Sequence, residues 1–158
     1  MRTVELLLSA ELEASVRRLW HRLHAAGLPS LATHSHPTNR PHLTLVAAAS
    51  VGRVPEFALP LPVTLGRVRM LGRALVREVV ATDELRAVQA AVWDSATEPG
   101  PMYSPGAWLP HVSLALNVRA DLRPAALALL DGLPAATGKL VAARGYDSAT
   151  RTATVLVA

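Results

Sequence analysis

The chain has 158 residues, of which 51% are hydrophobic and 18% charged, a composition typical of a folded domain rather than of a disordered chain. Its formal net charge is +4, and 15 of its 16 basic residues are arginine. It contains no cysteine, which excludes a disulfide framework, a thiol nucleophile and a cysteine-ligated metal. Any chemistry must therefore use histidine, carboxylate, hydroxyl or arginine side chains.

The length predicts one compact domain, residues 1–158. No apolar run is long enough to span a membrane, and the N-terminal sequence MRTVE lacks the layout of a signal peptide because an acid interrupts its short apolar stretch. We therefore expect a cytoplasmic monomer with no membrane partner. The arginine-rich charge is compatible with a polyanionic ligand such as RNA.

The first half of the chain predicts a strand, a helix and two further strands. The mainly apolar residues 4–8 predict a short buried strand, and Ser9 is a candidate N-cap for the helix that follows. An apolar stripe at helical spacing from Leu12 to Leu23 predicts an amphipathic helix. A polar loop leads to a strand from His42 to Ala47, and after a proline-rich linker another strand runs from about Val63 to Met70.

The same order begins again after Gly72. A strand is expected from Leu75 to Val80, and Thr82 is the candidate N-cap of a second helix that runs to about Ala96. A loop rich in proline and glycine then leads to a strand from Trp108 to Val118. The repeated order indicates two pseudo-repeats, residues about 1–72 and 73–158.

The end of the chain predicts a short helix and a closing hairpin. The helix runs from Pro124 to about Leu130, and residues 139–143 and 152–157 alternate as strands around a turn at 147–151. Helices and strands interleave, yet several connections are hairpin-like. This favours an α+β fold with mainly antiparallel sheets and outer helices over a doubly wound parallel sheet.

One five-residue motif occurs twice within the predicted strands, as PHLTL at residues 41–45 and as PHVSL at residues 110–114. Because strand side chains alternate between the two faces, the histidine and the hydroxyl of each motif share one face. Two such strands together offer two hydroxyls that hold a phosphate and two imidazoles that act as general base and general acid. The candidate catalytic and phosphate-binding residues are His42 with Thr44 and His111 with Ser113.

Other interpretations of the histidines stay open. A strand histidine is often an ordinary core or surface residue, and a third match, His36-Pro37-Thr38, lies in a polar stretch where we expect a loop. A metal site formed by His34, His36 and His42 is a further alternative, since neutral imidazoles bind zinc readily. The two-motif interpretation itself requires no metal and no cofactor.

The chain resembles the two-histidine phosphoesterase superfamily, and within it the bacterial 2'-5' RNA ligase and cyclic phosphodiesterase family. The two motifs, the order of elements and the aromatic, proline-rich approach YSPGAWLP at residues 103–110 carry the resemblance. It implies a bilobed, duplicated fold with two mainly antiparallel sheets around a central cleft and the two motif strands on opposite sides of that cleft. It also implies that His42 and His111 are catalytic and that Thr44 and Ser113 hold phosphate oxygens.

We therefore expect a metal-independent phosphodiesterase that acts on 2',3'-cyclic phosphate ends of RNA or nucleotides, giving a 2'-phosphate, with 2'-5' ligation as the reverse reaction. The alternative is a binding module of the same fold that holds RNA ends or nucleotides without turnover. Many members of the family carry a basic residue shortly after the second motif, where this chain has the sequence LALN at residues 114–117. Another arginine must then neutralise the phosphate, and Arg40 is the first candidate. Tyr103 and Trp108 are candidates for stacking on a base, and core packing is the alternative role for Trp108.

Overall fold

Strands, α-helices and short 3₁₀ helices follow one another along residues 1–54 and 56–157, which the computed structural model describes. The strands are β1 (Arg2–Leu8), β2 (His42–Val51), β3 (Leu61–Leu71), β4 (Ala74–Val79), β5 (Ala96–Pro99), β6 (His111–Ala115), β7 (Ala136–Asp147) and β8 (Thr152–Val157). The helices are α1 (Ala10–Ala25), η1 (Leu31–Thr33), α2 (Asp83–Asp94), η2 (Pro101–Tyr103), η3 (Ala120–Leu122) and α3 (Arg123–Leu129). No helix among these residues has both the length and the hydropathy that crossing a membrane requires.

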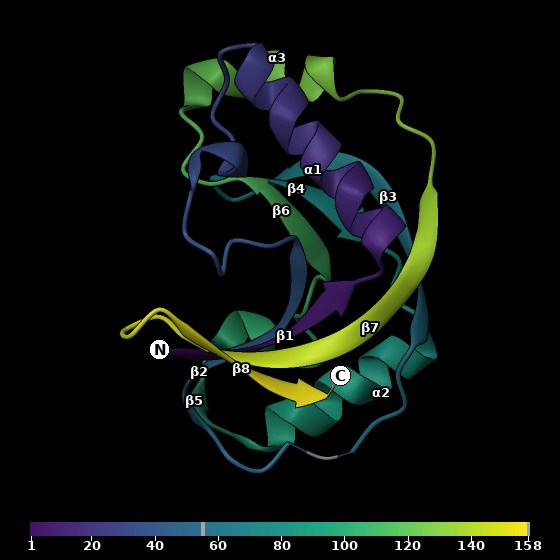
Figure 1. Ribbon diagram of the computed structural model, residues 1–158, viewed down its shortest axis with the longest axis vertical. Helices are drawn as coiled ribbons and strands as arrows, with labels where there is room; N and C mark the ends of the chain where they lie inside the picture. The colour runs from purple at the N-terminus through teal and green to yellow at the C-terminus, as the bar shows by residue number, and fades with distance from the viewer. Residues whose placement is uncertain (55, 158) are drawn as a thin grey trace.

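All strand pairings in the described residues are antiparallel, and the strands form one sheet in the order β1-β2-β6-β4-β3-β7-β8. β5 pairs with β2, and β7 pairs with β1 as well as with β3. This double pairing of β7 closes the ring of strands, and β7 follows a long curve along one side of the molecule (Figure 1). The predicted α+β class with antiparallel strands is confirmed, but the strands of the described residues form one sheet instead of the two predicted, because β7 pairs with both β1 and β3.

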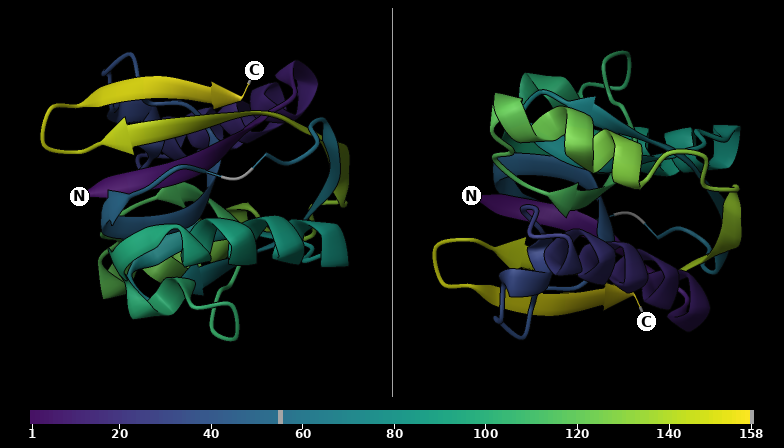
Figure 2. Two further views of the ribbon diagram at one scale, coloured as in Figure 1. Left: turned by 90° about the horizontal axis from the view of Figure 1, so that it is seen from below. Right: turned by 90° about the horizontal axis from the view of Figure 1, so that it is seen from above.

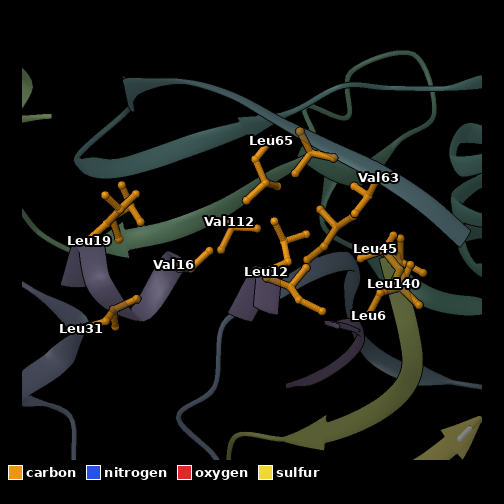
Figure 3. Packing of buried hydrophobic residues seen from close by; sticks show 14 of the residues in the cluster. Leu6, Leu12, Val16, Leu19, Leu31, Leu45, Val63, Leu65, Val112 and Leu140 are labelled. Atoms are coloured by element: carbon orange, nitrogen blue, oxygen red, sulfur yellow. The ribbon is translucent and has the colours of Figure 1, made fainter. Parts of the chain in front are cut away.

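The core lies between the sheet and the helices, which are on the outside of the molecule (Figure 2). The apolar stripe of α1 is buried as its spacing predicts, and Leu12 and Val16 of α1 point towards Val112 of β6 (Figure 3). Each fully buried side chain of this kind stabilises the fold by about 1.5–3 kcal/mol. The core therefore holds α1, from the first half of the chain, against the motif strand of the second half.

The two helix caps predicted from sequence differ in outcome. The hydroxyl of Thr82 accepts a hydrogen bond from the backbone N–H of Leu85, which is the N-cap contact expected for α2. The hydroxyl of Ser9 makes no such bond to α1 and instead accepts one from the backbone N–H of Lys139 at 3.1 Å. A Cβ on the neighbouring Gly138 would lie 2.9 Å from that hydroxyl, so only glycine allows this approach of β7 to α1.

Several element boundaries differ from the sequence prediction. β6 spans only His111–Ala115, because the residues before it turn inward to bury Trp108 and the residues after it bend away. The short strand β5 was not predicted, and it forms where residues 96–99 pair with the outer end of β2. β7 begins at Ala136 instead of Lys139 because it also pairs with β3.

Candidate active site

The two motif strands, β2 and β6, are antiparallel neighbours that pair through Leu43 and Val112, and do not lie on opposite sides of a cleft as the resemblance implied. Both of these side chains are fully buried, so the residues on either side of them face the opposite surface of the sheet. An antiparallel register through this pair sets His42 opposite Ser113, and it sets Thr44 opposite His111. The two motifs, 69 residues apart in the chain (42 to 111), therefore form one constellation.

Burial along the motif strands alternates as the sequence pattern predicts. The two histidines and the two hydroxyl residues are half-buried, and the residues between them are completely buried. The completely buried set is Leu43, Leu45, Val112 and Leu114. One face of the paired strands thus anchors the core, while the other presents imidazoles and hydroxyls to solvent.

Both imidazole rings are oriented by the same kind of backbone contact. The Nδ1 atom of His42 lies 2.7 Å from the carbonyl oxygen of Arg40, and the Nδ1 atom of His111 lies 2.7 Å from the carbonyl oxygen of Leu109. Because a carbonyl only accepts hydrogen bonds, each Nδ1 carries the proton. The Nε2 atom of neither ring forms a hydrogen bond with the described residues.

A buried carboxylate lies beside His42. The Oε2 atom of Glu5 is 3.5 Å from the Nε2 atom of His42, and the side chain of Glu5 is 4% exposed. Arg144 donates from Nε to Oε1 of Glu5 at 2.8 Å, and the hydroxyl of Thr3 donates to Oε2 at 2.8 Å. Glu5 pairs in register with Thr44 on one side and with Arg144 on the other. The charge of Glu5 is thus fixed next to His42 and offset by a buried guanidinium.

His111 has a different electrostatic environment. Burial lowers the pKa of His111 below the ordinary histidine value, because desolvation disfavours the imidazolium. The hydrogen bond to the carbonyl of Leu109 opposes this effect, and the charge of His42 lowers the pKa further. The two rings are therefore close enough to interact electrostatically, and the neutral form of His111 is favoured near pH 7.

Arginines surround the His111 side of the constellation. Glu78 of β4 pairs in register with His111, and its carboxylate lies 3.1 Å from Arg69 and 3.4 Å from Arg67. The hydrogen bond from Arg69 is the largest of the effects that lower the pKa of Glu78. Arg69 and Arg86 line a hollow of about 190 Å³ together with His111. Glu78 lines the same hollow and offsets the charge of Arg69, which leaves Arg86 as the second cation beside His111.

Two indoles hold the backbones of the hydroxyl residues. The Nε1 atom of Trp20 donates to the carbonyl of Ser113 at 3.1 Å, and the Nε1 atom of Trp108 donates to the carbonyl of Thr44 at 3.2 Å. Trp108 is only 3% exposed. The predicted stacking of Trp108 on a substrate base is therefore wrong, because its ring is packed in the core and has no free face.

Arg40 and Tyr103 lie at the borders of the constellation. Arg40 donates from Nε to Glu13 of α1 at 3.0 Å, and it lines a small hollow that also contains His42 and Ser113. Tyr103 is half-buried and lines another hollow beside His111. Arg40 is thus paired with Glu13 of α1 and also borders the motif face.

A larger cavity of about 550 Å³, which we call the His42 pocket, is lined by His42 and not by His111. It lies between the loop that precedes β2 and the β7–β8 hairpin, which are side by side in Figures 1 and 2. It is lined by Glu5, His34, Ser35, His36, Thr38, Asn39, His42, Leu116, Arg144, Tyr146 and Arg151. Within residues 1–54 and 56–157, no three histidine or acidic side chains are arranged to hold a metal ion, and this includes His34, His36 and His42.

The sequence prediction missed Glu5, Arg144 and Arg69. Glu5 carries a recognisable signal, since it is a single charge inside the apolar run VELLL, and a buried carboxylate requires a partner. That its partner is Arg144, 139 residues further along, depends on the pairing of β1 with β7.

No protein-family model and no curated protein matches this chain.

Proposed function

We propose that the protein is a metal-independent phosphodiesterase that opens 2',3'-cyclic phosphate ends of RNA or nucleotides to a 2'-phosphate, and that it is a member of the two-histidine phosphoesterase superfamily. The observation that carries the proposal is the placement of two histidine–hydroxyl pairs on one face of two neighbouring strands. A cyclic phosphodiester needs a base, an acid and hydrogen-bond donors to its phosphate, and this face supplies all three.

The proposed reaction assigns a role to each imidazole. His111 takes a proton from water through Nε2, because its lowered pKa keeps the ring neutral at physiological pH. The water oxygen forms a bond to phosphorus as the bond from phosphorus to the 3'-oxygen breaks. His42, whose Nε2 lies beside the carboxylate of Glu5, donates its proton to the departing 3'-oxygen. The proton ends on the 3'-hydroxyl, and the two rings return to their starting states through solvent.

The hydroxyls of Thr44 and Ser113 bind the non-bridging phosphate oxygens, on which negative charge grows during the attack. Arg69 and Arg86 beside His111 contribute positive charge to the same region. Acid or base assistance contributes about 10²–10⁴-fold to the rate per group, which makes the histidines the dominant residues.

The order of strands supports a duplicated, bilobed architecture of the kind found in this superfamily. The closed ring runs β1-β2-β6-β4-β3-β7 and returns to β1. Exchanging β1 with β4, β2 with β6 and β3 with β7 gives the same ring read in the opposite direction. The exchange relates residues 1–72 to residues 73–158. It maps the two motif strands, β2 and β6, onto each other, and these two strands are neighbours in the ring.

Substitution of the two histidines tests the proposal. The change His42→Ala and the change His111→Ala are each expected to lower kcat for a nucleoside 2',3'-cyclic phosphate by at least about 10². The wild-type rate is expected to persist in a chelator and to give the 2'-phosphate. His21→Ala, on the exposed face of α1, is the matched control and is expected to keep full activity.

Two outcomes contradict the proposal. Near-native turnover by either histidine variant, with circular dichroism showing an intact fold, rules out the paired mechanism. Tight binding of the cyclic nucleotide by the wild-type protein with no product after long incubation identifies a binding module instead of an enzyme.

A further inference from the structure

Apart from His42 and Glu5, the residues that line the His42 pocket take no part in the proposed chemistry. His42 lines this pocket and His111 does not, so it adjoins the two imidazoles on the His42 side. Its volume of about 550 Å³ lies within the roughly 300–1,000 Å³ typical of small-molecule sites. A ligand whose cyclic phosphate sits at the histidines therefore has a second binding volume next to it.

A buried guanidinium holds the two walls of this pocket together. Arg144 donates from Nε to Glu5 and from Nη2 to the backbone carbonyl of Thr38 at 2.8 Å, which ties the loop before β2 to the sheet. Within that loop the Nδ1 atom of His36 lies 2.8 Å from the hydroxyl of Thr38 and accepts from its backbone N–H. The third histidine–threonine match of the sequence is thus part of a wall of the pocket.

The pocket has an excess of positive charge and of hydrogen-bond donors. Glu5 is the only carboxylate among the described residues that line it, and Arg144 already offsets its charge. Arg151, in the turn of the β7–β8 hairpin, forms no ion pair with the described residues. His34 and His36 add two imidazoles at the exposed rim. Such a lining favours an anion, and Arg151 is suited to a phosphate because its guanidinium binds two oxygens at once.

We propose that the His42 pocket binds a second phosphate group of the substrate, so that the preferred substrate is a 2',3'-cyclic phosphate that also carries a 5'-phosphate. This inference rests on the proposed function for the position of the cyclic phosphate. The ring of Tyr146, which also lines the pocket, provides an aromatic surface for the nucleoside attached to that phosphate. The second phosphate belongs either to a free nucleotide or to the next residue of an RNA strand, and both present the same chemistry.

The test compares kcat/KM for three substrates: cytidine 2',3'-cyclic phosphate, its 5'-phosphorylated form, and a dinucleotide that ends in a cyclic phosphate. The wild-type protein is expected to prefer the two substrates with a second phosphate by at least about tenfold, the effect of one charge-assisted hydrogen bond. Arg151→Gln is expected to bring this ratio towards one. Arg119→Gln is the matched control, because Arg119 is an exposed arginine paired with Asp121 away from the pocket, and it is expected to leave the ratio unchanged.

The outcomes separate this inference from the proposed function. Turnover of all three substrates with no preference, or a preference that Arg151→Gln does not reduce, overturns the phosphate site. A gain for the dinucleotide alone also overturns it, because the added nucleoside and not the phosphate is then recognised.

A binding measurement that needs no turnover completes the test. Calorimetry with cytidine 5'-monophosphate and with cytidine is expected to show phosphate-dependent binding that Arg151→Gln weakens. If this result is obtained and no cyclic phosphate is hydrolysed, the phosphate site stands and the proposed function fails. If neither ligand binds more tightly than the other, the phosphate site is overturned whatever the activity.

Discussion

Leu43 of β2 pairs directly with Val112 of β6, and both side chains are completely buried. Because side chains on a strand alternate with a period of two, a slip of one residue in either strand would turn its histidine and hydroxyl into the core. Such a slip would also bring the buried apolar side chains to the surface, and the free-energy cost of exposing them fixes the register. The face that carries His42 and His111 is thus held in place by the residues on the opposite face.

The hydroxyls of the two motifs give the first prediction. Thr44→Ala and Ser113→Ala are each expected to lower kcat/KM for a nucleoside 2',3'-cyclic phosphate by about 10- to 150-fold, because a hydrogen bond to a charged group contributes about 1.5–3 kcal/mol. Steady-state kinetics on both variants measure the effect. Thr97→Ala, at an exposed position on β5, is the matched control and should behave as wild type. An unchanged kcat/KM in either motif variant would show that its hydroxyl does not touch the phosphate.

The second prediction concerns the titration of His111. Its midpoint, followed by NMR of the ring Cε1 proton, is expected to lie below the ordinary histidine pKa of about 6.5, with burial as the main cause. His42→Ala removes a nearby positive charge and should raise the midpoint of His111, although not to the ordinary value because the burial remains. A midpoint that does not move would show that the two rings are too far apart to interact.

The same pKa shift predicts a direction for stability. Because the pKa of His111 is lower in the folded state, the unfolded chain binds the proton at a higher pH than the folded chain. The contribution of His111 to stability is therefore complete above the unfolded-state pKa of about 6.5 and is lost as the pH falls towards the folded-state value. Urea unfolding at pH 7.5 and pH 5 is expected to show a smaller loss on acidification for His111→Gln than for wild type, and an equal loss contradicts the assignment.

Most of the elements could be predicted from the sequence because their signals are local. The stripe from Leu12 to Leu23 identifies α1, Thr82 marks the start of α2, and the strand alternation puts each histidine beside its hydroxyl. β5 could not be predicted, since residues 96–99 become a strand only by pairing with β2. Its four residues carry too short a pattern to reveal this.

The parts of the site that the sequence did not predict also depend on long-range strand pairing. Three contacts depend on pairings between strands that are separated in the chain. They are the approach of Glu5 to His42, the ion pair of Glu5 with Arg144, and the contacts of Glu78 with arginines. Trp108 was misassigned because an aromatic residue next to a motif fits either a stacking or a packing role from sequence alone. Its burial and its bond to the Thr44 carbonyl distinguish the two.

The buried ion pair gives the fourth prediction. Arg144→Met leaves the carboxylate of Glu5 buried without its guanidinium and is expected to lower the free energy of unfolding by about 3–5 kcal/mol. Combining it with Glu5→Gln should recover much of this loss, because the uncompensated charge is gone. Urea unfolding followed by circular dichroism measures both variants, with Arg119→Met on the surface as the control expected to match wild type. If the double variant is no more stable than Arg144→Met, the loss comes from packing and not from charge.

The indole contacts of the motif strands give the last prediction. Trp20→Phe and Trp108→Phe each keep an aromatic ring in the core but remove the N–H donor to the carbonyl of Ser113 or of Thr44. Leaving a buried acceptor without this donor is expected to lower the free energy of unfolding by about 1–3 kcal/mol. Trp93→Phe, at a half-buried position on α2, is the matched control and should lose less. Because the indoles hold the backbone beneath the hydroxyls, the two variants should also raise KM for a cyclic phosphate, which a purely apolar role would not do. Equal unfolding midpoints for all three variants, together with an unchanged KM, would mean that the indole hydrogen bonds do not support the site.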